Sequence, residues 1–134
     1  MSNPVLDDVR IVLVDDEPEM LDILEQFLRD GGARVTAAHS ARAALAAIAA
    51  DPPDVLLSDI GMPGEDGYWL IRAVRALPCG DGVRAIAMTG DVVTNPLARV
   101  LSAGFDELRA KPFDLDDLAG LIARLAATDT RCRA

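Results

Sequence analysis

Apolar and polar positions alternate along the chain between two kinds of segment. Short apolar segments that end at polar residues are typical of strands buried on both faces of a parallel sheet. Between them, large apolar residues recur every three or four positions, which is typical of helices with one buried face. The segments predicted to be strands are residues 9–14, 34–38, 54–58, 84–88 and 107–110.

Helix caps and turn residues mark the limits of the predicted helices. The residues expected to begin helices are Pro18, Ser40, the N-cap Asn95 with Pro96 as first residue, and Asp114. The expected ends are Gly31 with Gly32, residues 51–53, residues 78–82, and Gly104. The helical side chains expected to face the core are Leu21, Leu24, Phe27, Leu28, Leu45, Ile48, Leu70, Ile71, Val74, Leu77, Leu118, Leu121, Ile122 and Leu125.

Five alternations of strand and helix with short connections predict an α/β fold, a doubly wound parallel sheet. Crossover connections between parallel strands are right-handed, and apolar strands need helices on both faces of the sheet. The length of 134 residues fits one domain. We expect that domain at residues 9–127, after an N-terminal extension at 1–8 and before a C-terminal tail at 128–134.

Charge and composition narrow the classes of partner. The 13 basic and 22 acidic residues give a net charge of −9, the wrong sign for binding nucleic acid or an anionic membrane surface directly. The chain starts without a signal-peptide pattern and has no long apolar run, so we expect a cytoplasmic protein with no membrane insertion. Cys79 and Cys132 form no metal or disulfide pattern and are expected to be free thiols.

Polar residues that could bind a ligand or take part in a reaction follow four of the predicted strands. They are Asp15 and Asp16, Asp59, Thr89 and Lys111. In open parallel sheets, ligands bind beyond the carboxyl ends of the strands, where the strand order reverses. Three carboxylates in one crevice repel one another unless a cation compensates them, and oxygen ligands suit Mg²⁺ better than Zn²⁺. Lys111 is the only lysine among the 13 basic residues, which indicates a need for a compact ammonium group at this crevice.

Each candidate residue also has an ordinary structural explanation. A single aspartate after a strand, such as Asp15, is most often a loop residue or a helix cap. His39 is isolated in the sequence, and a lone histidine is most often a surface residue, so we assign it no role. Trp69 lies off the buried stripe of its helix and is expected to be exposed, either as part of a partner surface or without a role. The coincidence of candidates at four strand ends favours a functional site.

These residues resemble the receiver domains of two-component response regulators over residues 9–127. The motifs that carry the resemblance are VLVDDEP, SDIGMPGEDGY, MTG and AKPF. The stretch DIGMPGEDGY is most similar to receivers attached to hybrid histidine kinases. The resemblance implies a flavodoxin-like (βα)5 fold with strand order 2-1-3-4-5.

The resemblance also implies a phosphorelay function. Asp59 would accept a phosphoryl group from a phosphohistidine of a histidine kinase or a histidine phosphotransfer protein, and a downstream protein would read the result. The residues implied to hold Mg²⁺ are Asp16, Asp59 and the Gly61 carbonyl, with Asp15 acting through water. The groups implied to contact the phosphoryl oxygens are the Lys111 ammonium, the Thr89 hydroxyl and the Gly90 N–H. The protein would catalyse only its own phosphorylation and dephosphorylation.

One position departs from the family pattern. The switch pair would be Thr89 and an aromatic residue on the fifth strand, but the corresponding position holds Leu108. We therefore expect phosphorylation to move the loop after the fourth strand instead of an aromatic side chain. The Lys111–Pro112 bond resembles the cis peptide of the family.

The sequence leaves two other functions open. A receiver that is never phosphorylated could act as a protein-docking module, although the complete set of acidic, threonine and lysine residues argues against it. A Mg²⁺-dependent phosphatase of the haloacid-dehalogenase type needs a second aspartate two residues after the first, whereas Asp15 and Asp16 are adjacent. A nucleotide site is disfavoured because no glycine-rich phosphate loop follows the first strand.

Overall fold

The computed structural model describes residues 6–78 and 80–127, which form five strands and five α-helices in regular alternation. The strands are β1 (Arg10–Val14), β2 (Arg34–Ala38), β3 (Val55–Asp59), β4 (Arg84–Thr89) and β5 (Glu107–Ala110). The helices are α1 (Pro18–Asp30), α2 (Ala41–Ala50), α3 (Gly67–Arg75), α4 (Leu97–Ala103) and α5 (Leu115–Ala126), and a short 3-10 helix, η1 (Gly80–Gly82), precedes β4.

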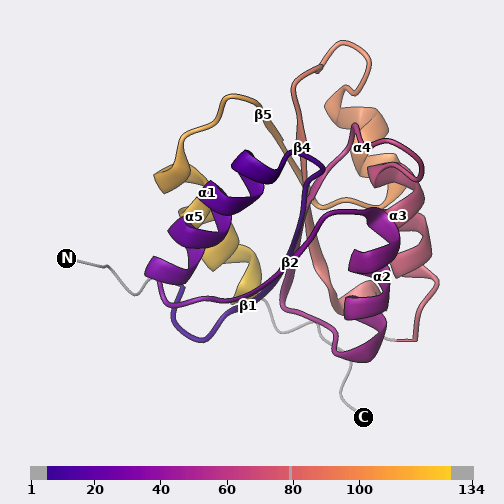
Figure 1. Ribbon diagram of the computed structural model, residues 1–134. Helices are drawn as coiled ribbons and strands as arrows, with labels where there is room; N and C mark the ends of the chain where they lie inside the picture. The colour runs from indigo at the N-terminus through magenta and orange to yellow at the C-terminus, as the bar shows by residue number, and fades with distance from the viewer. Residues whose placement is uncertain (1–5, 79, 128–134) are drawn as a thin grey trace.

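The strands form one parallel sheet in the order β2-β1-β3-β4-β5. This arrangement confirms the doubly wound, flavodoxin-like fold. Helices α1 and α5 cover one face of the sheet, and α2, α3 and α4 cover the other (Figure 1). The direction of winding reverses between β1 and β3, so the carboxyl ends of these two strands border the crevice in which such folds bind ligands.

The core lies in two layers, one on each face of the sheet. Successive side chains of a strand point to opposite faces, so Leu56 packs toward α2, α3 and α4, whereas Leu57 packs toward α1 and α5. Every residue of β3 is buried. Full burial of a leucine-sized side chain contributes about 1.5–3 kcal/mol, which makes this central strand a rigid base for the aspartate at its end.

Residues just before β1 also pack on the domain. Leu6 is completely buried in the layer formed with α1 and α5. Its N–H donates to the Gly31 carbonyl at 3.0 Å, and the Asp8 N–H donates to the Gly32 carbonyl at 3.0 Å. Gly32 has a φ of +99°, and a Cβ there would lie 2.9 Å from Asp7 Cα. The glycine is therefore needed both for the turn and for this close approach.

An arginine secures the end of the sheet away from the crevice. Arg75, at the end of α3, is 19% exposed and pairs with Asp106 at 3.2 Å. Its guanidinium also donates to the carbonyls of Gly80, Val83 and Gly104. One side chain thus ties α3 to the segments that enter β4 and β5.

The limits of several elements differ from the sequence prediction. Strand β1 begins one residue later than expected, and β3 and β4 extend to Asp59 and Thr89. Asn95 is not the N-cap of α4, because its side chain is engaged by other residues and Pro96 occupies the cap position without a side-chain hydrogen bond. The expected core residues that are only partly buried, at the margins of the two layers, are Phe27, Leu45, Leu77 and Leu125.

Candidate functional site

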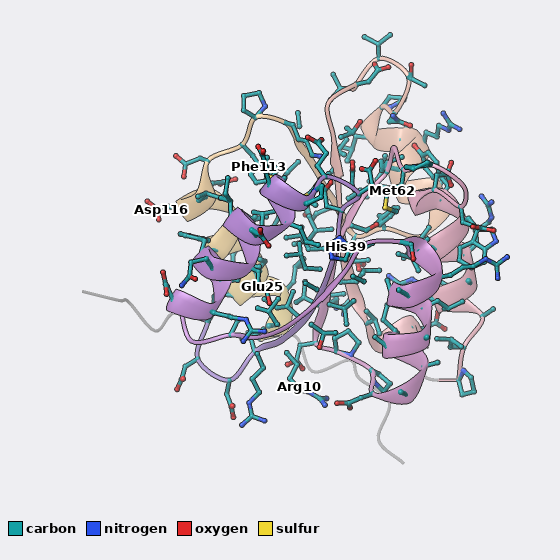
Figure 2. The ribbon with its side chains drawn as sticks, viewed as in Figure 1. Arg10, Glu25, His39, Met62, Phe113 and Asp116 are labelled. Atoms are coloured by element: carbon teal, nitrogen blue, oxygen red, sulfur yellow. The ribbon has the colours of Figure 1, made fainter. Side chains whose placement is uncertain are left out.

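The candidate site lies at the edge of the sheet where the strands end. Asp15 and Asp16 follow β1, Asp59 is the last residue of β3, and Lys111 follows β5. Figure 2 shows Met62 and Phe113, from the loops after β3 and β5, toward this end of the sheet and on either side of it, with Arg10 at the other end. The topology therefore gathers side chains that lie far apart in the sequence.

The lysine contacts two of the three aspartates. Lys111 Nζ lies 3.3 Å from Asp15 Oδ2 and 3.4 Å from Asp59 Oδ1. Asp15 is completely buried and Asp59 is 5% exposed. The Lys111 N–H donates to the Thr89 carbonyl at 2.7 Å, and the Lys111–Pro112 bond is cis, as the family resemblance implied. Backbone pairing with β4 thus fixes the stem of the lysine beside the carboxylates.

Burial and charge act in opposite directions on these groups. Burial raises the pKa of Asp59 from 3.8 to about 6; Lys111 counteracts this rise, and the charges of Asp15 and Asp16 add to it. Burial disfavours the Lys111 ammonium, but the Asp59 and Asp15 carboxylates outweigh burial and raise the pKa of the lysine. At neutral pH the site therefore holds an ammonium group next to a carboxylate whose charge is costly to bury.

The three aspartates fit a hard divalent cation. Each of Asp15, Asp16 and Asp59 offers a carboxylate oxygen, and these oxygens lie within 4.8 Å of one another. One Asp15 oxygen accepts the Glu17 N–H at 2.9 Å, and the other accepts from Lys111, which leaves Asp16 and Asp59 better placed to coordinate directly. Oxygen ligands of this kind in a partly hydrated loop suit Mg²⁺.

Two glycines in the loops after β3 and β4 have uncrowded surroundings. Within the described residues, a Cβ placed on Gly61 or Gly90 would have no atom within 4 Å other than those of the glycine and its two chain neighbours. Gly61 is the second residue after β3, and Gly90 is the first residue after β4. Neither loop is therefore crowded at these two glycine positions.

Gly67 is a site residue that the sequence reasoning missed. A Cβ on Gly67 would lie 2.7 Å from the Asp59 carbonyl oxygen and 2.8 Å from Ile60 Cα. The Gly67 N–H donates to the Ile60 carbonyl at 2.9 Å, and Asp66 caps α3 by accepting the Trp69 N–H at 2.9 Å. The first residue of α3 thus packs directly on the backbone at the end of β3. The sequence feature that could have identified Gly67 is the pair Asp66-Gly67 at the start of an apolar helix.

Thr89 is buried and its hydroxyl faces the loop between β4 and α4. The hydroxyl accepts the Asp91 N–H at 3.0 Å and the Asn95 Nδ2 at 3.3 Å, and it donates to the Asp91 carbonyl at 3.3 Å. The Asp91 carboxylate accepts the N–H groups of Val93 and Thr94 at 3.1 Å, and hydrogen bonds from Thr94, followed by that from Val93, hold its pKa below the usual range. These contacts give the loop a defined conformation.

Three other residues singled out in the sequence lie outside the carboxylate cluster. Leu108 on β5 is partly buried against the layer formed with α2, α3 and α4. Trp69 is partly buried, which corrects the expectation that it is exposed. It packs against the same layer, and the Arg42 guanidinium of α2 lies 5.3 Å from its ring centroid. His39 is exposed just after β2. Cys79 and Cys132 lie outside the described residues.

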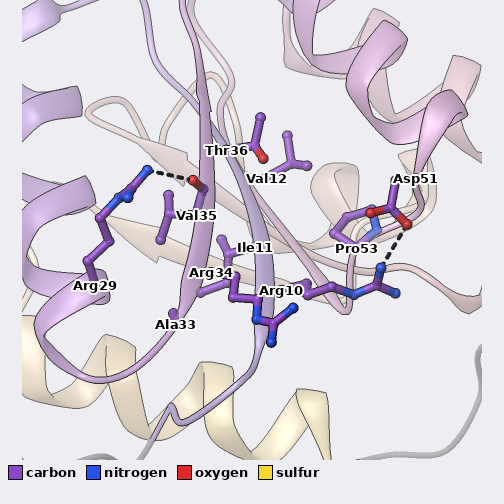
Figure 3. Close-up of a pocket in the computed structure, with 10 residues that line it drawn as sticks. All are labelled: Arg10, Ile11, Val12, Arg29, Ala33, Arg34, Val35, Thr36, Asp51 and Pro53. Atoms are coloured by element: carbon purple, nitrogen blue, oxygen red, sulfur yellow. Dashed lines mark hydrogen bonds and ion pairs between the residues drawn. The ribbon is translucent and has the colours of Figure 1, made fainter.

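A shallow pocket of about 430 Å³ lies at the opposite end of the sheet, along β1 and β2. Figure 3 shows Arg10 paired with Asp51 and Arg29 donating to the Val35 carbonyl, at 2.7 Å and 2.9 Å. Arg34, which also lines the pocket, pairs with Asp8 at 2.8 Å. The arginines of this pocket are thus engaged by protein groups, and the pocket is remote from the aspartate cluster.

Comparison with known proteins identifies a family and several relatives that are similar to this chain. The family model of the response regulator receiver domain matches residues 11–123. A 14.6 kDa protein of Leptolyngbya boryana is 39% identical over 112 residues, which cover 84% of this chain and 86% of that protein. Sensor histidine kinase GacS of Pseudomonas protegens is 32% identical over 86% of this chain, which spans only 13% of the kinase.

A solved structure with the same fold contains a metal ion. The receiver domain of sensor histidine kinase PA1611 from Pseudomonas aeruginosa aligns with a TM-score of 0.84 and 30% identity, covering 90% of this chain and 99% of that domain. In that structure a magnesium ion is coordinated in the active site cleft. Within the described residues of the present chain, no helix combines the length and apolar character needed to cross a membrane.

Proposed function

This chain belongs to the response regulator receiver domain family, and from that premise we propose that it is a phosphoacceptor signalling domain whose acceptor is Asp59. The observation that carries the proposal is the position of the Asp59 carboxylate, in contact with Lys111 and within 4.8 Å of carboxylate oxygens of Asp15 and Asp16. A buried carboxylate with one fixed cation beside it and a cation site next to it is suited to attack a phosphoryl group.

In the proposed reaction, an Asp59 carboxylate oxygen attacks the phosphorus of a phosphohistidine. A phosphorus–oxygen bond forms as the phosphorus–nitrogen bond breaks, and its electron pair passes to the imidazole nitrogen of the partner. The Lys111 ammonium, the Gly90 N–H and the Thr89 hydroxyl stabilise the charge on the equatorial phosphoryl oxygens. Attack of water on the acyl phosphate regenerates the Asp59 carboxylate and releases phosphate.

Mg²⁺ is the cofactor that fits this site. Asp16, Asp59 and the Gly61 carbonyl would hold the ion, with Asp15 acting through a bound water. Bound Mg²⁺ supplies positive charge that allows the anionic acceptor and the anionic phosphoryl group to approach each other. The raised pKa of Asp59, caused first by burial and then by its acidic neighbours, supports the need for such a charge.

The proposal includes the signalling context. Receiver domains are signalling domains and not enzymes that act on external substrates; this one would catalyse only its own phosphorylation and dephosphorylation. The donor would be a histidine kinase or a histidine phosphotransfer protein, the setting would be the cytoplasm, and residues 9–127 would form the receiver. Because Leu108 replaces the aromatic switch residue, the signal would leave through the loop between β4 and α4.

The test is the intact mass of the protein after incubation with acetyl phosphate and Mg²⁺. We expect the addition of one phosphoryl group, lost in Asp59→Asn and when EDTA removes the metal. The matched control is Asp54→Asn, which replaces the aspartate just before β3. This variant should still gain one phosphoryl group. Phosphorylation of Asp59→Asn to the same extent as wild type would contradict the assignment of the acceptor.

A further inference from the structure

A chain of hydrogen bonds connects Thr89, at the end of β4, to a tyrosine on helix α3. Asn95 Nδ2 donates to Thr89 Oγ1 at 3.3 Å, and Tyr68 Oη donates to Asn95 Oδ1 at 2.9 Å. Tyr68 lies in the first turn of α3 and is 6% exposed. A buried phenol that lost its acceptor would leave an unsatisfied polar group, which is costly. The position of the Asn95 amide therefore determines whether the Tyr68 phenol keeps its hydrogen-bond acceptor.

The Thr89 hydroxyl has no spare capacity in this arrangement. A hydroxyl offers one donor hydrogen and two acceptor lone pairs. The donor points to the Asp91 carbonyl, while the Asp91 N–H and the Asn95 amide occupy the acceptor sites. A phosphoryl oxygen on Asp59 would need the donor hydrogen of Thr89, so the hydroxyl must turn away from the loop. Its bonds to Asp91 and Asn95 then lengthen or break.

Tyr68 also contacts the helix that follows this loop. Arg99 of α4 lies 4.5 Å from the centroid of the Tyr68 ring, and its guanidinium donates to the Thr94 carbonyl at 2.9 Å. The side chain of Tyr68 thus joins α3, the loop between β4 and α4, and α4 itself. Leu108, at the usual switch position, has no polar atom with which to join such a chain.

We propose that Asn95 and Tyr68 are positioning residues that transmit the state of the Thr89 hydroxyl to α3 and α4. This inference rests on the proposed phosphoacceptor function, which supplies the signal. With Asp59 unmodified, Tyr68 holds Asn95 and Asn95 holds Thr89 in the loop. When the phosphoryl group takes the Thr89 hydroxyl, Asn95 loses that contact, and the hydrogen bond to the Tyr68 phenol and the packing of Arg99 on its ring change.

The sequence provides a direct probe, because Tyr68 is the only tyrosine of the 134 residues. Protein labelled with [13Cζ]tyrosine gives one resonance, which reports the hydrogen bond of the phenol. We expect Mg²⁺ with beryllofluoride, a phosphoryl mimic, to shift that resonance. Asn95→Ala should abolish the response while the Gly90 amide still shifts. Ser102→Ala, which removes an exposed hydroxyl from α4, should respond like wild type.

A conservative variant tests the energetic coupling. Tyr68→Phe removes the phenol oxygen but keeps a ring beneath Arg99, so Asn95 and Thr89 are held less firmly in the unmodified state. Loss of one such hydrogen bond should tighten beryllofluoride binding about 2- to 10-fold, because less free energy is needed to leave that state. Equal affinity in Tyr68→Phe and wild type would overturn the proposal.

The outcomes separate this inference from the proposed function. A shift of the Gly90 amide with an unchanged Tyr68 resonance in wild type would overturn the connection through Asn95 and leave the acceptor function intact. If neither resonance responds to saturating beryllofluoride and Mg²⁺, the acceptor function itself is wrong, and the connection has no signal to transmit. The inference is supported if the Gly90 amide and the Tyr68 resonance both shift in wild type and only the Tyr68 shift is lost in Asn95→Ala.

Discussion

Replacement of Asp59 by asparagine should stabilise the domain at neutral pH in the absence of metal. Burial, opposed by Lys111, raises the pKa of Asp59 from 3.8 to about 6. At about 1.4 kcal/mol per pKa unit, this difference corresponds to a cost of about 3 kcal/mol for holding the ionised carboxylate in the folded protein. Asparagine has a similar volume and does not ionise, so Asp59→Asn should recover most of that free energy.

The pH dependence gives the prediction its sign. The folded state binds the Asp59 proton more tightly than the unfolded state, so the folding free energy of wild type becomes less favourable, relative to Asp59→Asn, as the pH rises from about 4 to about 6. Above that range the difference should level off near about 3 kcal/mol. Below the unfolded pKa of 3.8, both states are protonated and the difference should vanish.

The assay is urea unfolding of both proteins between pH 4 and pH 8 with EDTA present, followed by far-UV circular dichroism. Taking the difference between the two proteins cancels the titration of the groups that do not interact with Asp59. Added Mg²⁺ should stabilise wild type more than Asp59→Asn and so narrow the gap, because a ligand that binds only the folded state stabilises it. A difference that stays constant across this pH range, or that favours wild type at pH 8 without metal, would refute the reasoning.

Three further substitutions test particular contacts. Lys111→Met removes the charge that lowers the pKa of Asp59 and a partner of the phosphoryl group, so the rate of phosphorylation by acetyl phosphate should fall about 100-fold; an unchanged rate would argue against the role of the ammonium. Arg75→Met removes the guanidinium that donates to the carbonyls of Gly80, Val83 and Gly104 and should lower the free energy of unfolding in urea by about 2–3 kcal/mol. Arg72→Met, at an exposed position of the same helix, should change it by less than about 0.5 kcal/mol, and similar losses in both variants would contradict this account. Gly67→Ala places a methyl group 2.7 Å from the Asp59 carbonyl oxygen. It should lower the free energy of unfolding by about 1–3 kcal/mol, and with it the melting temperature and the phosphorylation rate. Wild-type values of both would show that the backbone accommodates the methyl group.

The sequence predicted the strands and the aspartate cluster because both depend on simple rules. The apolar segments identified five strands, and a parallel sheet necessarily brings the residues that follow them, such as Asp15 and Lys111, to one edge. The order of the strands followed only from the family resemblance. Neither step required knowledge of side-chain contacts between distant segments.

The features that the sequence did not predict all depend on such contacts. Asn95 before a proline has the pattern of a helix cap, but Tyr68 of α3 and Thr89 of β4 engage its side chain instead. Trp69 lies off the buried stripe of α3, but it packs against the margin of the core, and Arg42 of α2 lies over its ring. Local periodicity contains no information about these partners.

The central claim is that Asp59 forms an acyl phosphate, and borohydride reduction tests it most directly. Reduction converts an acyl-phosphorylated aspartate into homoserine, so peptide mass mapping identifies the modified position. After treatment with acetyl phosphate and Mg²⁺, we predict homoserine at position 59 and unmodified aspartate at positions 15 and 16. Homoserine at either of those positions instead, or none under conditions where the intact mass shows a phosphoryl group, would contradict the account.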